Sequence, residues 1–225
     1  QRLLLLYEKL ARVERDVAQA GSLTSALAKW EKTIDPAGQP DYWSVLEGLV
    51  ASFPLDGDTS EAGNRSESGK FVDGPAGFAT GRAGQAADLD GRRFIDAGNV
   101  ANFGYFDKFS LAAWIRPHGE HGGTIISRMT DAEQGDGYSV QLTNGRIQVN
   151  LVKRWLDDAV RVETERVLAA DRWQHVMVTY DGSRVAGGIT VYIDGEPEKL
   201  KVNLDFINQT FASKEPLRIG GGGGP

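Results

Sequence analysis

The 225-residue chain is 40% hydrophobic, which is ordinary for a globular protein with a real core. Its 31 acidic and 25 basic residues give a formal net charge of −6, and no basic run is interleaved with aromatic residues, which argues against a nucleic-acid partner. The absence of cysteine excludes disulfides, thiolate metal sites and a cysteine nucleophile. The longest apolar run, Leu3 to Tyr7, is far shorter than the roughly 20 residues that span a bilayer.

Residues 2–34 have the apolar spacing of an amphipathic α-helix. Apolar or small side chains recur three or four residues apart and form one seam, at Leu3, Leu6, Leu10, Val13, Val17, Ala20 and Leu27. The Gly21-Ser22 pair either ends one helix and caps the next, which would make a hairpin, or is tolerated within one long helix. The unbroken phase of the seam favours one helix. Because Pro36 and Pro40 stop it, we expect a helical arm and linker over residues 1–47.

From about Val50 onward the apolar period becomes two, which indicates β-strands. Alternate apolar side chains share one face in residues 109–115, 176–180 and 189–193. Asn144-Gly145 is the strongest hairpin signal, because a type I′ turn needs positive φ at both central positions. Many short strands without helical patterns between them predict a mainly β fold, an antiparallel β-sandwich, over residues 48–225.

Seven short motifs, in order over about residues 50–221, resemble the laminin G-like branch of the concanavalin A-like lectin and glucanase superfamily. They are Phe53-Pro-Leu-Asp-Gly57, Gly84-Gln-Ala-Ala-Asp-Leu-Asp-Gly91, Phe109-Ser-Leu-Ala-Ala-Trp-Ile-Arg-Pro117, Gly137-Tyr-Ser-Val-Gln-Leu142, Trp173-Gln-His-Val-Met-Val-Thr-Tyr-Asp-Gly182, Val191-Tyr-Ile-Asp-Gly195 and Pro216-Leu-Arg-Ile-Gly-Gly221. The resemblance implies a concanavalin A-like jelly roll preceded by the α-helix. Family patterns continue into one more strand, so we expect the sandwich to be truncated at its C-terminal end.

The arm and its exit, with Trp30-Glu-Lys and Pro40-Asp-Tyr-Trp-Ser-Val-Leu46, resemble the spacer of large exported planctomycete proteins that carry cytochrome-type domains. This second resemblance implies a larger multidomain parent. It also implies an extracytoplasmic location, periplasmic or extracellular.

Most motif residues have a structural explanation. Asp181-Gly182 and Asp194-Gly195 are turn formers, since glycine accepts positive φ and aspartate bonds its own backbone. We expect Trp114 and Trp173 to be core aromatic residues. His175, on the strand face opposite the apolar stripe, is expected to be a structural histidine.

No catalytic pattern is present in the expected strands. The glucanase branch carries Glu-x-Asp-x-x-Glu on one strand, which places three carboxylates on one face, and this pattern is missing here. We interpret Glu163 and Glu165, which share a face without a third carboxylate, as a solvated strand edge. No Gly-x-Ser-x-Gly elbow occurs. We therefore predict a non-catalytic module.

Calcium is the one cofactor that the resemblance implies, because laminin G-like domains often hold one calcium ion and calcium takes several oxygen ligands. The acids near the first strands that could supply them are Asp56, Asp58, Asp73, Asp88 and Asp90. The alternative is that these acids serve turns.

The first function that we predict is carbohydrate or glycoconjugate binding, by an aromatic ring stacked on a sugar. The run from Lys153 to Asp158 breaks strand alternation, and a lysine in the core phase indicates that the strand ends or bulges there. The candidate ligand residues are Trp155, Arg154, Asp157 and Asp158, with Tyr138, His118 and His121 completing a rim. In the other interpretation Trp155 is tucked against the sheet.

The alternative function is protein interaction or architecture, in which the helix and the sandwich dock neighbouring domains of the parent. The apolar seam of the arm supports it, because an amphipathic helix must bury that face.

Overall fold

The computed structural model describes residues 47–62, 68–119, 122–130 and 135–223. The chain divides into two units, residues 1–49 and residues 50–225, and every strand below belongs to the second unit. The predicted helix over residues 2–34, with its Gly21-Ser22 pair, lies outside the described residues.

Two antiparallel sheets and a small hairpin make up the second unit. The strands are β1 (Lys70–Val72), β2 (Phe78–Thr80), β3 (Gln85–Ala87), β4 (Phe94–Asp96), β5 (Phe109–Ile115), β6 (Gly123–Met129), β7 (Gly137–Thr143), β8 (Arg146–Arg154), β9 (Asp158–Thr164), β10 (Gln174–Tyr180), β11 (Ile189–Ile193), β12 (Glu196–Pro197), β13 (Leu200–Phe206) and β14 (Arg218–Ile219), with a 3-10 helix η2 (Ala186–Gly188) before β11. Among the described residues, no helix is long and apolar enough to cross a membrane.

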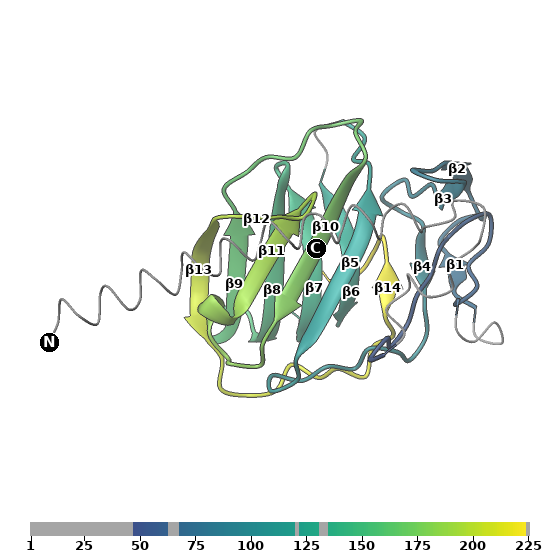
Figure 1. Cartoon of the computed structure of the whole chain (residues 1–225). Coiled ribbons are helices and arrows are strands. Elements are labelled where there is room, and N and C mark those ends of the chain that lie inside the picture. Colours follow the sequence, from purple (N-terminus) through teal and green to yellow (C-terminus); the bar gives the residue numbers. More distant parts are fainter. Residues whose placement is uncertain (1–46, 63–67, 120–121, 131–134, 224–225) are drawn as a thin grey trace, which may run out of the picture. The chain divides into compact units, whose positions relative to one another are not determined.

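The strand order identifies a sandwich. The eight-stranded sheet runs β1-β4-β14-β6-β7-β8-β9-β13, the four-stranded sheet runs β12-β11-β10-β5, and β2 pairs with β3. In Figure 1 the four-stranded sheet lies in front of the eight-stranded one. The predicted mainly β antiparallel sandwich is confirmed.

The predicted hairpin at Asn144-Gly145 is also confirmed. These two residues join β7 to β8 and have φ values of 50° and 73°. Thr143 and Arg146 on either side of the turn are paired, so the turn fixes the register of these two inner strands of the large sheet.

The core lies between the two sheets and follows from strand alternation. Along β10 and β11 every second side chain is buried, while the intervening ones are partly exposed. Four aromatic rings pack at its centre with centroids 5.5 to 6.5 Å apart, those of Phe109, Tyr138, Tyr180 and Phe211. The Tyr138 hydroxyl donates to the Ala101 carbonyl oxygen at 2.8 Å, so its buried polar atom is satisfied.

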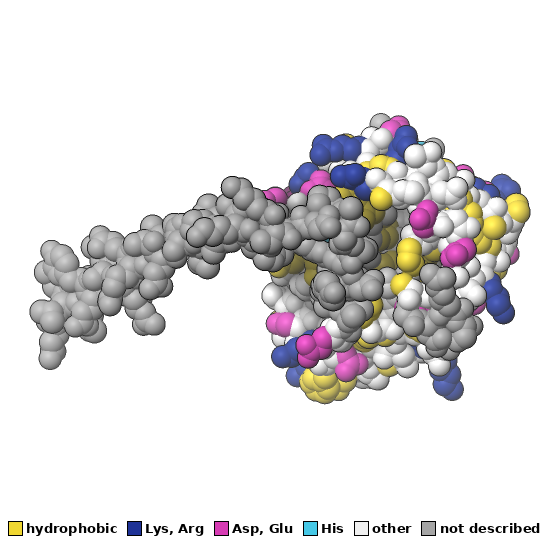
Figure 2. Space-filling model, turned by 45° about the vertical axis from the view of Figure 1, so that its right-hand side comes forward, with side chains coloured by type: hydrophobic (Ala, Val, Ile, Leu, Met, Phe, Trp, Pro, Cys, Tyr) yellow, Lys and Arg dark blue, Asp and Glu magenta, His cyan; other side chains and the backbone are white. Residues whose placement is uncertain are grey.

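The surface of this unit mixes apolar and charged side chains. Figure 2 shows hydrophobic side chains at several places on one face, with Lys, Arg, Asp and Glu between them. The large hydrophobic side chains that are most exposed in this unit include Phe106, Trp114, Leu156, Val167 and Phe206.

The core assignment predicts a contrast between two residues of β11. Ile193 is fully buried, so Ile193→Ala is expected to lower the free energy of unfolding by about 2–5 kcal/mol. Thr190 lies on the opposite face of the strand, and Thr190→Ala is expected to cost at most about 1 kcal/mol. Urea unfolding followed by circular dichroism measures both, and equal losses would contradict the assignment of the two faces.

Candidate functional site

The outer face of the eight-stranded sheet, turned away from the core, carries two rows of polar side chains. We call it the polar face. Cross-strand register places Arg218, Ser127, Ser139, Asn150 and Arg161 in the first row, and Thr124, Gln141, Gln148, Glu163 and Lys201 in the second. The apolar residues that alternate with them in β8 and β9 belong to the core. Because these face inward, the polar residues between them face outward.

A glycine run lies over one part of the polar face. The Ser127 hydroxyl donates to the Gly221 carbonyl oxygen at 2.7 Å, and the Gln141 amide donates to the Gly223 carbonyl oxygen at 2.5 Å. A Cβ atom on Gly223 would stand 3.1 Å from the Cβ atom of Ser127, so glycine permits this close approach. The run lies over β6 and β7 and leaves β8, β9 and β13 to form the rest of the face.

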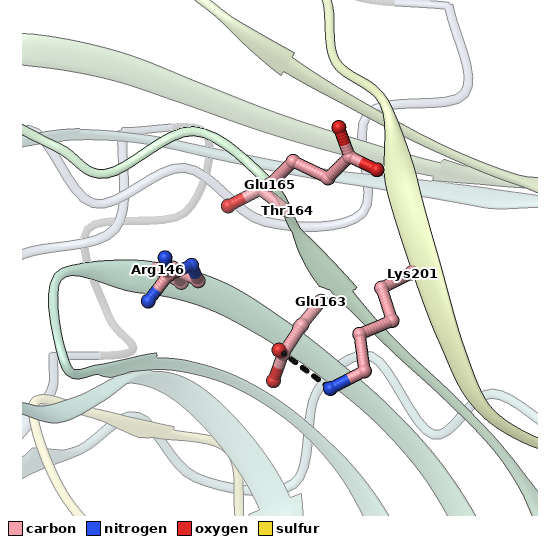
Figure 3. Close-up of a pocket in the computed structure, with 5 residues that line it drawn as sticks. All are labelled: Arg146, Glu163, Thr164, Glu165 and Lys201. Carbon is pink, nitrogen blue, oxygen red and sulfur yellow. Dashed lines mark hydrogen bonds and ion pairs between the residues drawn. The ribbon is translucent and has the colours of Figure 1, made fainter.

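A pocket of about 400 Å³ opens on that remaining part of the polar face. It is lined by Arg146 of β8, by Glu163, Thr164 and Glu165 at the end of β9, and by Lys201 of β13. Figure 3 shows the Glu163 carboxylate pointing toward the Lys201 ammonium, from which it is 3.4 Å away. All five side chains carry hydrogen-bonding groups, so the pocket is suited to a polar ligand.

Glu163 is the best-connected residue of this pocket. Its carboxylate accepts hydrogen bonds from the Gln148 amide at 3.0 Å and from the Asn203 amide at 3.5 Å, in addition to Lys201. Burial alone would raise the pKa of the Glu163 carboxyl, but the bonds from Asn203 and Lys201, the charge of Lys201 and the Gln148 amide together lower it. Glu163 is therefore an ionised acceptor at neutral pH.

Our interpretation of Glu163 and Glu165 as a strand edge was wrong, although Glu165, just after β9, is solvent-exposed as expected. β9 lies between β8 and β13, so it is an inner strand, and β13 forms that edge of the sheet. The strand order depends on pairing with residues about 40 positions away, which the local pattern of β9 does not contain.

Trp155 follows β8 at one end of the polar face and is partly buried. It packs on the small cluster of Met129, Val152, Ala159 and Leu204, and the Arg161 guanidinium lies 4.3 Å from the centre of its ring. The register of β8 and β9 shifts between Val152 and Arg154, so the predicted bulge near Lys153 is confirmed. One face of the indole is therefore occupied by Arg161. Trp155 is neither fully free at the rim nor fully tucked against the sheet, the two arrangements that the sequence allowed.

Two other predicted ligand residues are exposed, and two are not. Arg154 and Asp157 form an exposed ion pair at 2.8 Å beside Trp155. Asp158 is 1% exposed, and its carboxylate accepts from the Asn208 backbone N–H at 2.7 Å. The prediction of Asp158 and Tyr138 as ligand contacts was wrong, because the first holds a loop and the second is a core residue, also 1% exposed.

The histidine loop lies away from Trp155. His118 contacts Asp171 at 3.3 Å, and His121 lies outside the described residues. Backbone bonds from Asp171 to Pro117 and from Leu168 to Gly145 place this loop at the β7–β8 turn. Trp155 follows the other end of the nine-residue strand β8, roughly 26 Å away at about 3.3 Å per residue. The structure therefore does not bring His118 to the predicted rim.

Four of the five acids proposed for calcium bond groups of the chain itself, and Asp88 and Asp90 share Arg93. Asp56 accepts from the Gln85 N–H, Asp58 from the Ser60 N–H and Asp90 from the Arg92 and Arg93 N–H groups, while Asp88 pairs with Arg93 and Asp73 is an exposed residue with φ 58°. Within the described part of the chain, no group of three or more acids or histidines could hold a metal ion. A calcium site stays a prediction of the sequence.

A second surface lies on the outer face of the four-stranded sheet. Trp114 is 50% exposed there, with its ring centre 5.2 Å from that of His175 and 5.3 Å from the Arg82 guanidinium. Met177 and Tyr192 are paired beside them. We call these five residues the Trp114 patch. The prediction of Trp114 as a core aromatic was wrong, although its phase in β5, opposite to that of the core residues, indicated the outer face.

The family model described as the concanavalin A-like lectin/glucanases superfamily, in its laminin G form, matches residues 89–225. This match covers more than half of the chain, so the chain belongs to that superfamily. The similarity to it that the seven motifs indicated is confirmed.

Solved structures with the same fold include two of the botulinum neurotoxin D receptor-binding domain. One is 15% identical with a TM-score of 0.50, covering 76% of this chain and 44% of that one; the other is 14% identical with a TM-score of 0.50, covering 76% and 42%. Domains LG4-5 of the mouse laminin alpha1 chain are 18% identical with a TM-score of 0.40, covering 52% and 29%. The chain spans less than half the length of each. None of the curated proteins compared with the chain matches it.

The buried position of Asp158 leads to a stability prediction. Asp158→Ala leaves the Asn208 and Gln209 donors without their acceptor and is expected to cost about 2–4 kcal/mol of unfolding free energy. Asp157→Ala, which removes only an exposed ion pair, is expected to cost less than about 1 kcal/mol. Chemical denaturation of both variants tests the contrast. If Asp158→Ala is as stable as the unchanged protein, Asp158 does not hold the loop and is again a candidate ligand residue.

Proposed function

We propose that residues 50–225 form a non-catalytic binding module for a carbohydrate or glycoconjugate, and that the polar face is its binding surface. The observation that carries this proposal is the open pocket beside Glu163, lined by hydrogen-bonding side chains on three neighbouring strands. A sugar hydroxyl both donates and accepts hydrogen bonds, and this surface offers acceptors in Glu163 and Glu165 and donors in Arg146 and Lys201.

The arrangement around Glu163 supports recognition more than catalysis. Its carboxylate is held by three side chains from two neighbouring strands, so it is oriented before a ligand arrives. A site built to pair with a hydroxyl rejects a ligand that lacks it, because the site's own polar groups are then left unpaired. Membership of a superfamily that includes lectins agrees with this function.

We further propose that the module serves a larger, exported parent protein. The support is the resemblance of the arm to exported spacers, together with the fold, which laminin G-like modules of multidomain proteins share. In this arrangement the module selects the surface on which the rest of the parent acts.

Glu163→Gln and Gln148→Ala test the glycan site. A glycan array of the whole chain, with and without calcium, first identifies a ligand, and calorimetry then compares the variants. Glu163→Gln removes the charged acceptor and Gln148→Ala removes a bond that orients it. Each change is expected to weaken binding by about tenfold, since bonds to charged groups contribute roughly 1.5–3 kcal/mol. Thr190→Ala, on the outer face of the other sheet, is the control and is expected to bind as the unchanged protein does.

Unchanged affinity in Glu163→Gln and Gln148→Ala, with the fold intact, would remove the polar face from the binding function. Turnover of a β-glucan that depends on Glu163 or Glu165 would instead assign a catalytic role.

The Trp114 patch favours protein docking as a second function. Tryptophan, tyrosine and methionine are enriched in protein interfaces, and a half-exposed tryptophan backed by His175 resembles an interaction hot spot. The patch lies on the opposite sheet from the polar face, so both functions fit one domain.

A photo-crosslinking amino acid in place of Trp114, within the full parent protein, tests this docking. We expect crosslinks from position 114 to another domain or protein, and far fewer from position 110, which is exposed on the same face of β5. If Trp114→Ala instead loses affinity for the glycan, the Trp114 patch binds the glycan and not a protein.

A further inference from the structure

One end of the sandwich carries four exposed hydrophobic side chains on separate segments of the chain. They are Phe106 before β5, Leu156 between β8 and β9, Val185 after β10 and Phe206 at the end of β13, and each is between 46% and 75% exposed. We call these four residues the apolar end. Val167 is also exposed, but it lies beside the β7–β8 turn, at the opposite end of the strands.

Hydrogen bonds between the segments show that they are neighbours. The Ala186 backbone N–H donates to the Asp205 carboxylate at 2.7 Å, which joins the loop after β10 to the end of β13. The Asp158 carboxylate accepts from the Asn208 backbone N–H, which joins the β8–β9 turn to the segment after β13. Figure 1 shows the loops before β5 and after β13 together at this lower end of the sandwich.

A core tyrosine holds two of these loops in place. The Tyr180 hydroxyl donates to the Tyr105 carbonyl oxygen at 2.7 Å and accepts from the Arg184 backbone N–H at 3.0 Å. Arg184 has a φ of 64°, a conformation that is unfavourable for residues other than glycine unless surrounding contacts hold it. Gly182 lies against the Phe106 carbonyl oxygen, where a Cβ atom would collide. The backbone that presents the Phe106 ring to solvent is therefore fixed by contacts with the core.

Arg184 adds a positive charge beside the exposed rings. Its guanidinium lies 5.2 Å from the ring centre of Phe106 and 5.7 Å from that of Tyr105. No carboxylate of the described residues pairs with this guanidinium. The carboxylates of Asp107 and Asp205 instead accept bonds from backbone N–H groups of the loops. The acids at this end therefore stabilise the loops, and the cation is free to meet an anionic group of a partner.

Exposed hydrophobic side chains that cluster in this way mark a binding surface for a protein or a lipid bilayer. A bilayer fits better, because the four side chains project from four separate segments that belong to both sheets. A bilayer interface accepts such side chains singly, and it places amphipathic tyrosine and arginine side chains at the level of the headgroups. Phe106, Tyr105 and Arg184 provide this combination at one point of the surface.

We propose that the apolar end docks on the surface of a phospholipid bilayer. Its four hydrophobic side chains insert just below the headgroups, and the Arg184 guanidinium contacts a lipid phosphate. Docking of this kind is peripheral and needs no membrane-spanning helix. It is independent of the glycan function, because none of these residues lines the pocket beside Glu163.

Co-sedimentation of the whole chain with phosphatidylcholine vesicles, with and without phosphatidylserine, tests this proposal. We expect binding to both kinds of vesicle. Phe106→Ser and Phe206→Ser are each expected to weaken binding by about tenfold, because each removes a ring that leaves water on docking. Val167→Ser, at a similarly exposed hydrophobic position of the opposite end, is the matched control and is expected to bind as the unchanged protein does.

Fluorescence quenching measures whether the apolar end enters the bilayer. In Phe106→Trp, vesicles of brominated phosphatidylcholine are expected to quench the fluorescence of the added indole, whereas in Val167→Trp they are expected to leave it unchanged. Arg184→Gln is expected to weaken binding to vesicles that contain phosphatidylserine by about fivefold, since one basic side chain near an anionic surface is lost. Circular dichroism shows that each variant is folded.

Absence of binding to both kinds of vesicle would overturn the proposal, as would binding that Phe106→Ser and Phe206→Ser leave unchanged. If the chain does not bind vesicles and a photo-crosslinking amino acid at position 106 of the full parent protein captures another protein domain, the apolar end is a protein interface instead. Neither result would change the test of the glycan site, which uses other residues.

Discussion

The packing of two sheets against one shared core is the constraint on which the rest of this unit depends. Because Val176, Val178 and Tyr180 must face inward from β10, the residues between them must face outward. The same rule applies to β8 and β9, where the outward positions are polar except at Val152 and Ala159, which pack with Trp155. The core therefore determines which side chains form the Trp114 patch and which form the polar face, before any ligand is considered.

The two outer faces have different chemistry, and the difference follows from what covers them. On the polar face, side chains of β6 and β7 donate hydrogen bonds to the carbonyl oxygens of Gly221 to Gly223. The polar side chains of that half are therefore hydrogen-bonded within the chain. No described segment covers the other half in this way, and its Glu163 network bonds across strands instead. The outer face of the four-stranded sheet lacks a polar network of this kind among its described residues and presents an aromatic ring.

Local patterns predicted the fold well because turns and alternation are local properties. Asn144-Gly145 and the period of two in β5 are visible within a few residues. Strand alternation also indicates that Trp114 faces outward and that Tyr138, which shares its face with Val140 and Leu142, faces inward. The residue types alone suggested the opposite in both cases. The burial of Asp158 was beyond a local pattern, because its partners lie about 50 residues further along the chain.

The polar face also depended on strand order, which the sequence pattern does not contain. β13 pairs outside β9, so Lys201 and Asn203 reach Glu163 from a strand distant in the sequence. Gln148 reaches the same carboxylate from β8 on the other side, so Glu163 is held by two strands before any ligand arrives. The pairing of β8, β9 and β13, and not the local pattern of β9, therefore builds the candidate site.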